Sequence, residues 1–96
     1  MIIQLRSVLS IAQVLGGKIH TIDLGGQGTV RGLVDVLAAE YGDPLRRLML
    51  QDREPAELLP YVKIYVNGRG VDFLEGLETG LQEGDDVLIM PQISGG

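Results

Sequence analysis

The chain ends in Ser94-Gly95-Gly96, and this ending offers a C-terminal carboxylate on a slender segment. Because glycine has no side chain, Gly95 and Gly96 could enter a narrow channel and adopt backbone conformations closed to other residues. A carboxylate is a poor electrophile, but adenylation would give it a good leaving group that sulfide or a thiol could displace. The alternative is that the two glycines are an idle, frayed end of the chain.

A glycine-rich loop, Gly25-Gly26-Gln27-Gly28, stands between an expected strand and an expected helix, where phosphate-binding loops occur. The dinucleotide pattern needs a glycine at the position of Arg31, and no Gly-Lys-Ser/Thr follows the loop. We interpret the loop as a connection and helix cap. We therefore expect no bound cofactor, and expect any ATP used on the tail to be bound by a partner enzyme.

Other reactive side chains lack suitable companions. His20 is the only histidine and the chain has no cysteine, which argues against a zinc site, a triad or a thiolate nucleophile. Lys18 and Lys63 could accept isopeptide bonds, but we interpret them as solvated strand residues. Carboxylates gather in three groups without EF-hand spacing, which predicts a solvated acidic surface that could dock a basic partner: Asp52/Glu54/Glu57, Asp72/Glu75/Glu78 and Glu83/Asp85/Asp86.

The charge is uneven along the 96 residues, which suffice for one small domain. Residues 1–50 carry five Lys or Arg and four Asp or Glu, whereas residues 51–96 carry three and nine. This acidity disfavours nucleic acid and favours a basic protein surface. No apolar run approaches the roughly 18 residues of a membrane span. We expect no membrane partner and a cytoplasmic location.

In the first half of the chain, alternating apolar residues predict strands over residues 2–9 and 18–24. The Gly16-Gly17 turn between them suggests a hairpin, with a bulge near His20 because Ile19 falls out of phase. A helix is predicted over residues 30–41, with Thr29 as N-cap and with Gly42 and Pro44 at its end. Its apolar stripe is Val30, Leu33, Val34, Leu37, Ala38 and Tyr41.

In the second half, a short helix is expected over 45–49, a polar loop over 51–57, and strands over 62–66 and 87–90. Asn67-Gly68 is a strong turn signal, and Phe73, Leu74 and Leu77 are expected to pack an irregular segment. This order predicts an α+β fold in which one main helix covers a mixed sheet. We predict a domain over residues 1–91 and a flexible Gly-Gly tail, residues 92–96, projecting from the sheet edge.

Four segments together resemble the ThiS/MoaD family, and their order and spacing are hard to obtain by chance: 62–68 (VKIYVNG), 71–79 (VDFLEGLET), 83–87 (EGDDV) and 90–96 (MPQISGG). Members of this family are small ubiquitin-like sulfur carriers with the β-grasp fold. The resemblance implies that an E1-like enzyme of the MoeB/ThiF type adenylates Gly96, with Gly95 keeping the tail slender. A sulfur donor then forms a thiocarboxylate, and a client enzyme consumes the sulfur. The chain would be a carrier subunit and not an enzyme.

The resemblance leaves the client open. The Pro91-x-x-Ser94-Gly95-Gly96 ending is most like the molybdopterin synthase small subunit, which implies that enzyme's large subunit as the client. However, Gln92 stands where that subfamily often has a second proline, and Ser7 stands near a usual large apolar residue. The 73–79 segment also resembles carriers for cysteine synthesis and archaeal modifiers. The alternatives are therefore a modifier that forms isopeptide conjugates, or a carrier for cysteine, thiamine or thiolated tRNA synthesis.

Overall fold

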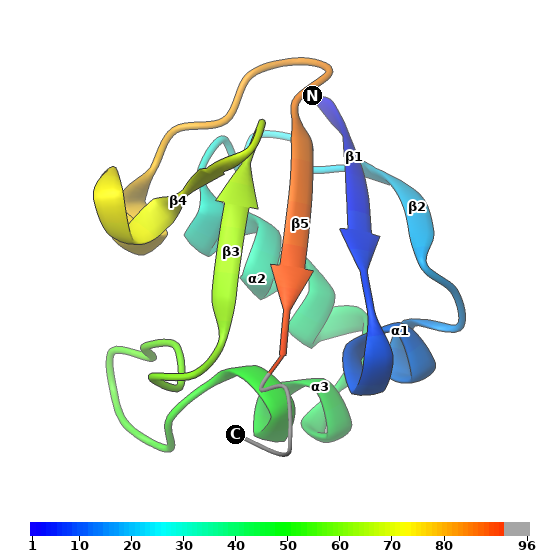
Figure 1. Ribbon diagram of the computed structural model, residues 1–96, viewed down its shortest axis with the longest axis vertical. Coiled ribbons are helices and arrows are strands. Elements are labelled where there is room, and N and C mark those ends of the chain that lie inside the picture. Colours follow the sequence, from blue (N-terminus) through cyan, green and yellow to red (C-terminus); the bar gives the residue numbers. More distant parts are fainter. Residues whose placement is uncertain (92–96) are drawn as a thin grey trace.

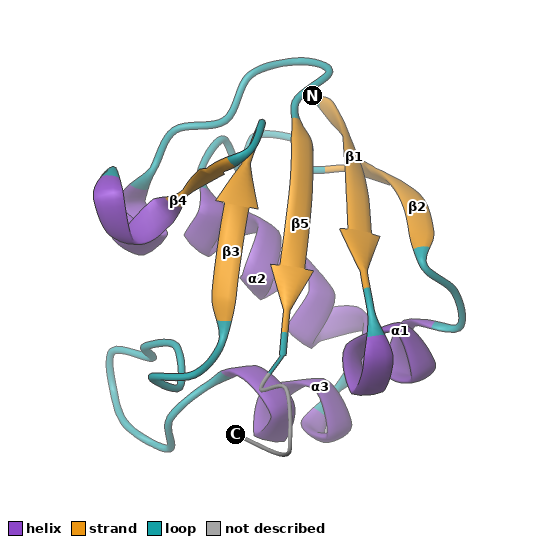
Figure 2. Ribbon diagram, viewed as in Figure 1, coloured by secondary structure: helices purple, strands orange, loops and turns teal. Residues whose placement is uncertain are grey.

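The computed structural model describes residues 1–91, and the predicted tail 92–96 lies outside the described residues. Five strands form one mixed sheet in the order β2-β1-β5-β3-β4, with helices on one side (Figures 1 and 2). The elements in chain order are β1 Ile2–Ser7, α1 Leu9–Leu15, β2 Ile19–Asp23, α2 Val30–Tyr41, α3 Asp43–Met49, β3 Lys63–Val66, β4 Arg69–Gly70, the 3-10 helices η1 Val71–Phe73 and η2 Gly76–Glu78, and β5 Asp86–Met90.

The last strand occupies the middle of the sheet. β5 pairs parallel with β1, from Gln4–Asp86 to Ser7–Ile89, and antiparallel with β3. The edges of the sheet are β2 and β4. The predicted mixed sheet is confirmed. The strand that leads to the tail lies in the middle of the sheet and not at its edge, and the predicted projection of residues 92–96 lies outside the described residues.

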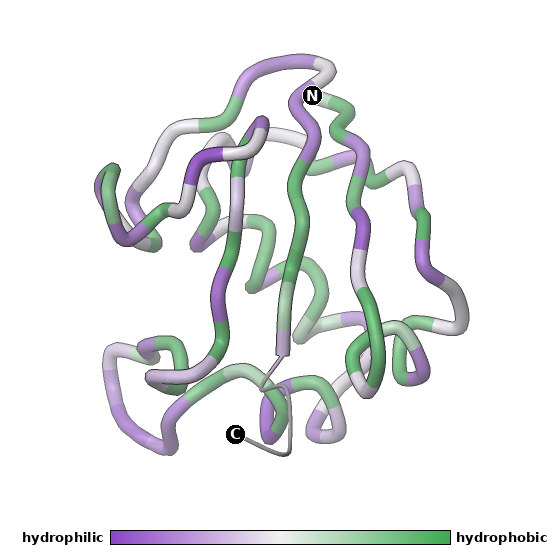
Figure 3. The backbone as a smooth tube through the Cα atoms, viewed as in Figure 1, coloured by the Kyte–Doolittle hydropathy of each residue, from purple (hydrophilic) through white to green (hydrophobic). Residues whose placement is uncertain are grey.

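The core lies between the sheet and α2, which crosses behind it in Figure 1. Alternate residues of the three inner strands are buried, among them Leu5, Ile64 and Ile89, and they pack in one cluster with Leu33 and Leu37 of α2. Figure 3 shows the apolar colour running along β5 and along much of α2. An aliphatic core thus forms on one side, and the other face of the sheet stays open.

Helix α2 forms as its sequence predicts. The Thr29 side chain accepts a hydrogen bond from the Gly32 amide at 3.0 Å, which caps the first turn. Gly42 ends the helix with a φ of 71°. Pro44 then lies in the first turn of α3, where its missing N–H has no intrahelical partner to lose.

The connection between β1 and β2 differs from the predicted glycine turn. The two strands do pair antiparallel, from Ile2–Asp23 to Arg6–Ile19, without the expected bulge. The segment between them, however, forms α1, whose Ile11, Ala12 and Leu15 are buried and whose end is capped by a glycine at φ 80°. Ile19 is out of phase with Ile22 and Leu24 because its side chain is on the exposed face of β2, where it is 68% exposed.

The segment after the Asn67-Gly68 turn also differs from its prediction. Asn67 and Gly68 both have positive φ, as a tight hairpin turn between β3 and β4 requires. Beyond the hairpin, Val71 and Leu77 are buried, but Phe73 is 91% exposed. The prediction that Phe73 packs this segment is therefore wrong.

Two buried hydroxyl groups differ in their hydrogen bonding. Ser7 is buried, and its Oγ has no hydrogen-bond partner among residues 1–91. Thr79 Oγ1 accepts from the Glu75 amide at 3.1 Å and donates to the Gly76 carbonyl at 2.7 Å. The Ser7 hydroxyl is destabilising, because a buried polar group without a hydrogen bond costs free energy. Removing the Thr79 hydroxyl would be destabilising, because its two backbone partners would lose their hydrogen bonds.

We predict that Ser7→Ala raises the free energy of unfolding by about 1 kcal/mol, and that Thr79→Val lowers it by about 1–3 kcal/mol. Urea denaturation of both variants beside the parent chain measures the two effects. A clear loss of stability in Ser7→Ala would contradict the assignment of an unsatisfied hydroxyl.

Candidate functional site at the carboxyl end of the central strand

The described chain ends on a firmly held strand. β5 has a neighbour on each side up to its last residues, with Ile89 opposite Ser7 and Met90 opposite Lys63. Pro91, which follows, is buried. Gly95 and Gly96 lie outside the described residues, but the five residues after Pro91 can span at most about 17 Å. Any chemistry at Gly96 must therefore occur close to this end of the sheet.

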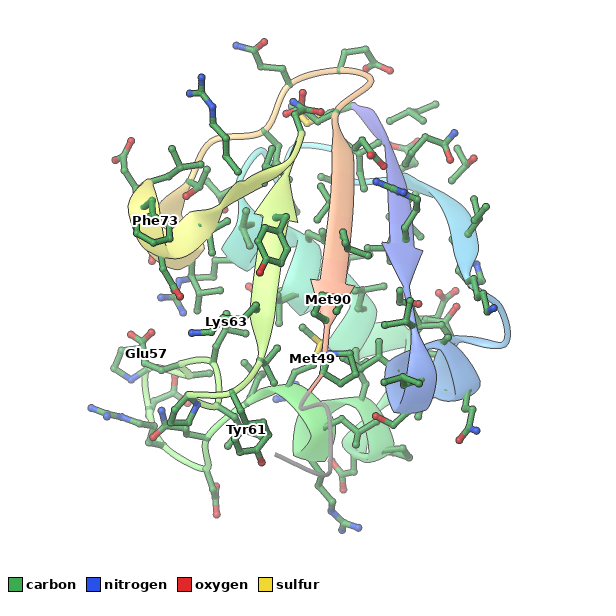
Figure 4. All side chains as sticks on the ribbon, in the orientation of Figure 1. Met49, Glu57, Tyr61, Lys63, Phe73 and Met90 are labelled. Carbon is green, nitrogen blue, oxygen red and sulfur yellow. The ribbon has the colours of Figure 1, made fainter. Side chains whose placement is uncertain are left out.

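A half-buried apolar strip covers the open face above that end. It consists of Tyr65 on β3 with Leu88 and Met90 on β5, and we call these three residues the apolar strip. Tyr65 lies opposite Leu88 in the register. Together with Arg6, Gly68 and Asp86, they line a shallow hollow of about 340 Å³. Figure 4 shows Met90 in front of β5, on the side away from α2.

Ion pairs border the apolar strip on both sides. Arg6 donates two hydrogen bonds to Asp86, from Nε at 3.0 Å and from Nη2 at 2.6 Å. Lys63 Nζ donates to Asp72 at 2.9 Å. Exposed pairs of this kind add little stability, at most about 1 kcal/mol each. Their effect is to orient the long side chains and to neutralise charge beside the strip.

Arg31 connects the helix layer to the segments that flank β3. Its Nε donates to Glu78 at 2.7 Å and its Nη1 donates to the Ala56 carbonyl at 2.9 Å, while Nη2 lies 3.9 Å from Glu57. The hydrogen bond to Glu78 raises the pKa of Arg31, so its charge is stabilised. The sequence did not predict this positioning role. There, Arg31 mattered only because it occupies a position where the dinucleotide-binding motif needs a glycine.

The other candidate residues do not assemble into a site. His20 Nε2 lies 3.3 Å from the Gly17 carbonyl, and Asp23 instead accepts from the Gly25 amide at 2.9 Å. Within residues 1–91, no group of three His, Asp or Glu side chains could hold a metal ion. Of the acidic groups, Glu57, Asp72, Glu78 and Asp86 are paired with cations, so the predicted acidic surface is partly neutralised.

The part of the chain that the structure describes has no helix long and apolar enough to cross a membrane.

A mixed sheet that holds one long helix, with its C-terminal strand in the centre, is the β-grasp arrangement of ubiquitin-like proteins. The family model described as the ThiS family matches residues 11–96. The chain therefore belongs to the ThiS family.

The proteins that this chain is similar to include both sulfur carriers and protein modifiers. The sulfur carrier protein CysO of Mycobacterium tuberculosis is 38% identical over 68 residues, which cover 71% of this chain and 72% of CysO. The small archaeal modifier protein 3 of Haloferax volcanii is 33% identical over 94 residues, which cover 98% of each protein. The chain thus belongs to a group of small sulfur carriers and ubiquitin-like modifiers.

Solved structures confirm the ubiquitin-like β-grasp fold. The solution structure of the Haloferax volcanii HVO 2177 protein matches with a TM-score of 0.83 at 33% identity, covering 100% of this chain and 87% of that one. A chain in the crystal structure of the Amycolatopsis orientalis BexX/CysO complex matches with a TM-score of 0.72 at 27% identity, covering 98% and 99%. That CysO protein therefore forms a complex with another protein.

Substitutions on the two faces of β5 are predicted to lower stability by different amounts. Ile89 is fully buried, so Ile89→Ala should lower the free energy of unfolding by about 2–5 kcal/mol. Leu88 lies on the open face, so Leu88→Ala should cost clearly less, about 1 kcal/mol or below. Chemical denaturation of both variants gives the two values. Equal losses would mean that the open face is covered in the folded chain.

Proposed function

We propose that this chain is a sulfur carrier whose C-terminal Gly96 is adenylated by an E1-like enzyme and then converted to a thiocarboxylate. The observation that carries the proposal is the central strand β5, which delivers the chain to Pro91 at one end of a firmly paired sheet. The match to the ThiS family extends through residue 96 and supports the same reading of the tail.

The proposed chemistry takes place on the tail and needs two reactants from outside the chain. The Gly96 carboxylate attacks the α-phosphate of ATP on the partner enzyme, which gives an acyl-adenylate and pyrophosphate. Sulfide then attacks the acyl carbon, the bond to the phosphate oxygen breaks, and AMP leaves. Gly95 and Gly96 have no side chains that would obstruct the partner's active site.

The open face supplies the proposed docking surface for the partner. The apolar strip of Tyr65, Leu88 and Met90 leads toward Pro91, so a protein bound there also has the tail within reach. The bordering ion pairs leave the strip without net charge, which lowers the cost of covering it with a partner. We propose this face for the E1-like enzyme and for the client in turn.

The ending Pro91-x-x-Ser94-Gly95-Gly96 favours molybdopterin synthesis as the proposed pathway, with the molybdopterin synthase large subunit as client. The second candidate function is a protein modifier that forms isopeptide bonds through Gly96. The similarity to a small archaeal modifier protein over nearly the full chain favours that alternative.

The carrier hypothesis predicts a mass change at the tail. Protein isolated from a host that contains its sulfur machinery should include a form in which one oxygen of Gly96 is replaced by sulfur. Intact and fragment mass spectrometry detect this exchange, and a chain lacking Gly96 is the control. If the cognate E1-like enzyme, ATP and sulfide produce no such form, the carrier hypothesis fails.

The modifier hypothesis predicts a different pattern in cells. Immunoblots against the tagged chain should show a ladder of conjugates of higher mass, and deletion of Gly96 should abolish the ladder. A carrier that is not a modifier should give a single band under oxidative and sulfur-limited growth alike. A ladder that persists without Gly96 would contradict attachment through the tail.

A further inference from the structure

Phe73 is the most exposed large apolar residue of the described chain. Its exposure is 91%, against 68% for Ile19, the next in order. It is also the only phenylalanine in the sequence. A ring held in water forgoes the stabilisation that burial would give, and exposed aromatic residues are typical of protein-binding sites. Packing in the core therefore does not account for Phe73, and its exposure points to a binding role.

The turn that carries Phe73 is well anchored. Val71 and Leu77, on either side of it, are buried at 1% and 6% exposure. The Leu74 amide donates to the Val71 carbonyl at 2.9 Å, and Asp72 accepts from Lys63. Figure 4 shows Phe73 at the outer edge of the molecule, beside β4. Because its backbone is already fixed, binding through this ring has a small entropic cost.

Phe73 is continuous with the apolar strip. A shallow hollow of about 220 Å³ is lined by residues that include Lys63, Tyr65, Gly70 and Phe73. Gly70 lies between the two aromatic rings: a Cβ at this position would lie 3.5 Å from the Phe73 ring and 3.6 Å from the Tyr65 ring. Because glycine has no Cβ, the space between the rings stays open. Tyr65 also belongs to the strip that runs to Met90. The apolar surface thus extends from Phe73 to the end of β5.

We infer that Phe73 is the anchor residue for the enzyme that activates Gly96, inserting into an apolar pocket rimmed by basic residues while the tail enters the active site; this inference rests on the proposed function. The pocket is apolar because the ring needs apolar contacts. We assign the basic rim from the net charge of −5, whose acidic excess lies in residues 51–96. Glu75, close to Phe73 in the chain, has no ion-pair partner among residues 1–91.

Charge also argues against a second copy of this chain as the occupant. Two copies would each carry a net charge of −5, and like net charges disfavour association. A partner of opposite charge gains both a faster encounter and a better fit. The tail sets a further condition, because the partner must also reach within about 17 Å of Pro91.

The test compares Phe73→Ala with Ile19→Ala, a change of another exposed apolar residue on the opposite edge strand, β2. Both variants are assayed with the source organism's E1-like enzyme for pyrophosphate release and for binding affinity. Phe73→Ala should raise KM and Kd about tenfold or more with kcat unchanged, and Phe73→Tyr should restore most of the affinity. Ile19→Ala should match the parent chain. Added salt should weaken parent binding.

The thermal midpoint of Phe73→Ala should equal that of the parent, because the ring is almost fully exposed. Equal KM and Kd for Phe73→Ala and the parent chain overturn the anchor, as does an equal loss in Ile19→Ala. A parent dimer in sedimentation that Phe73→Ala dissociates also overturns it, in favour of a second copy. If the parent chain binds the E1-like enzyme but is not adenylated, the proposed function alone is refuted. If it neither binds nor is adenylated, both the proposed function and the Phe73 anchor are refuted.

Discussion

The parallel pairing of β1 with β5 is the interaction on which the rest of the structure depends. It joins segments about 80 residues apart, such as Arg6 and Asp86, and it places the last strand between β1 and β3. Its inward side chains, among them Leu5, Val87 and Ile89, are fully buried against the helix layer. Because β5 cannot move without opening the core, the point at which the chain reaches Pro91 is fixed relative to both faces of the sheet.

This constraint divides the molecule into two working parts. One face of the sheet packs with α2 and supplies stability, while the other carries the apolar strip and its flanking ion pairs. Arg31 ties the helix layer to Ala56 and Glu78, so the segments that flank the open face are braced from behind. In our proposal, partners recognise this rigid face and the chemistry takes place on the short segment that follows Pro91.

Much of the fold could be predicted because its signals are local. The Thr29 cap, the apolar stripe of α2 and the Asn67-Gly68 turn each act over a few residues. Helix α1 was missed because it lies between two strands that pair with each other, so the Gly16-Gly17 signal was interpreted as a hairpin turn, and no side-chain cap marks the start of the helix. The central position of β5 depends on pairing with β1, which no local pattern reports. Phe73 was assigned to packing because hydrophobicity alone does not tell an anchor from a core residue. Gly95 and Gly96 were identified by their chemistry and by family resemblance, and the structure describes the strand that leads to them.

The central claim is that the open face and the tail form one working surface. Amide NMR spectra of the ¹⁵N-labelled chain, titrated with the cognate E1-like enzyme, test it most directly. The account predicts that shifts and line broadening concentrate at Tyr65, Leu88 and Met90 and continue into the tail, while amides on the outer side of α2 stay unchanged. Changes concentrated on α2, with the open face unaffected, would contradict it.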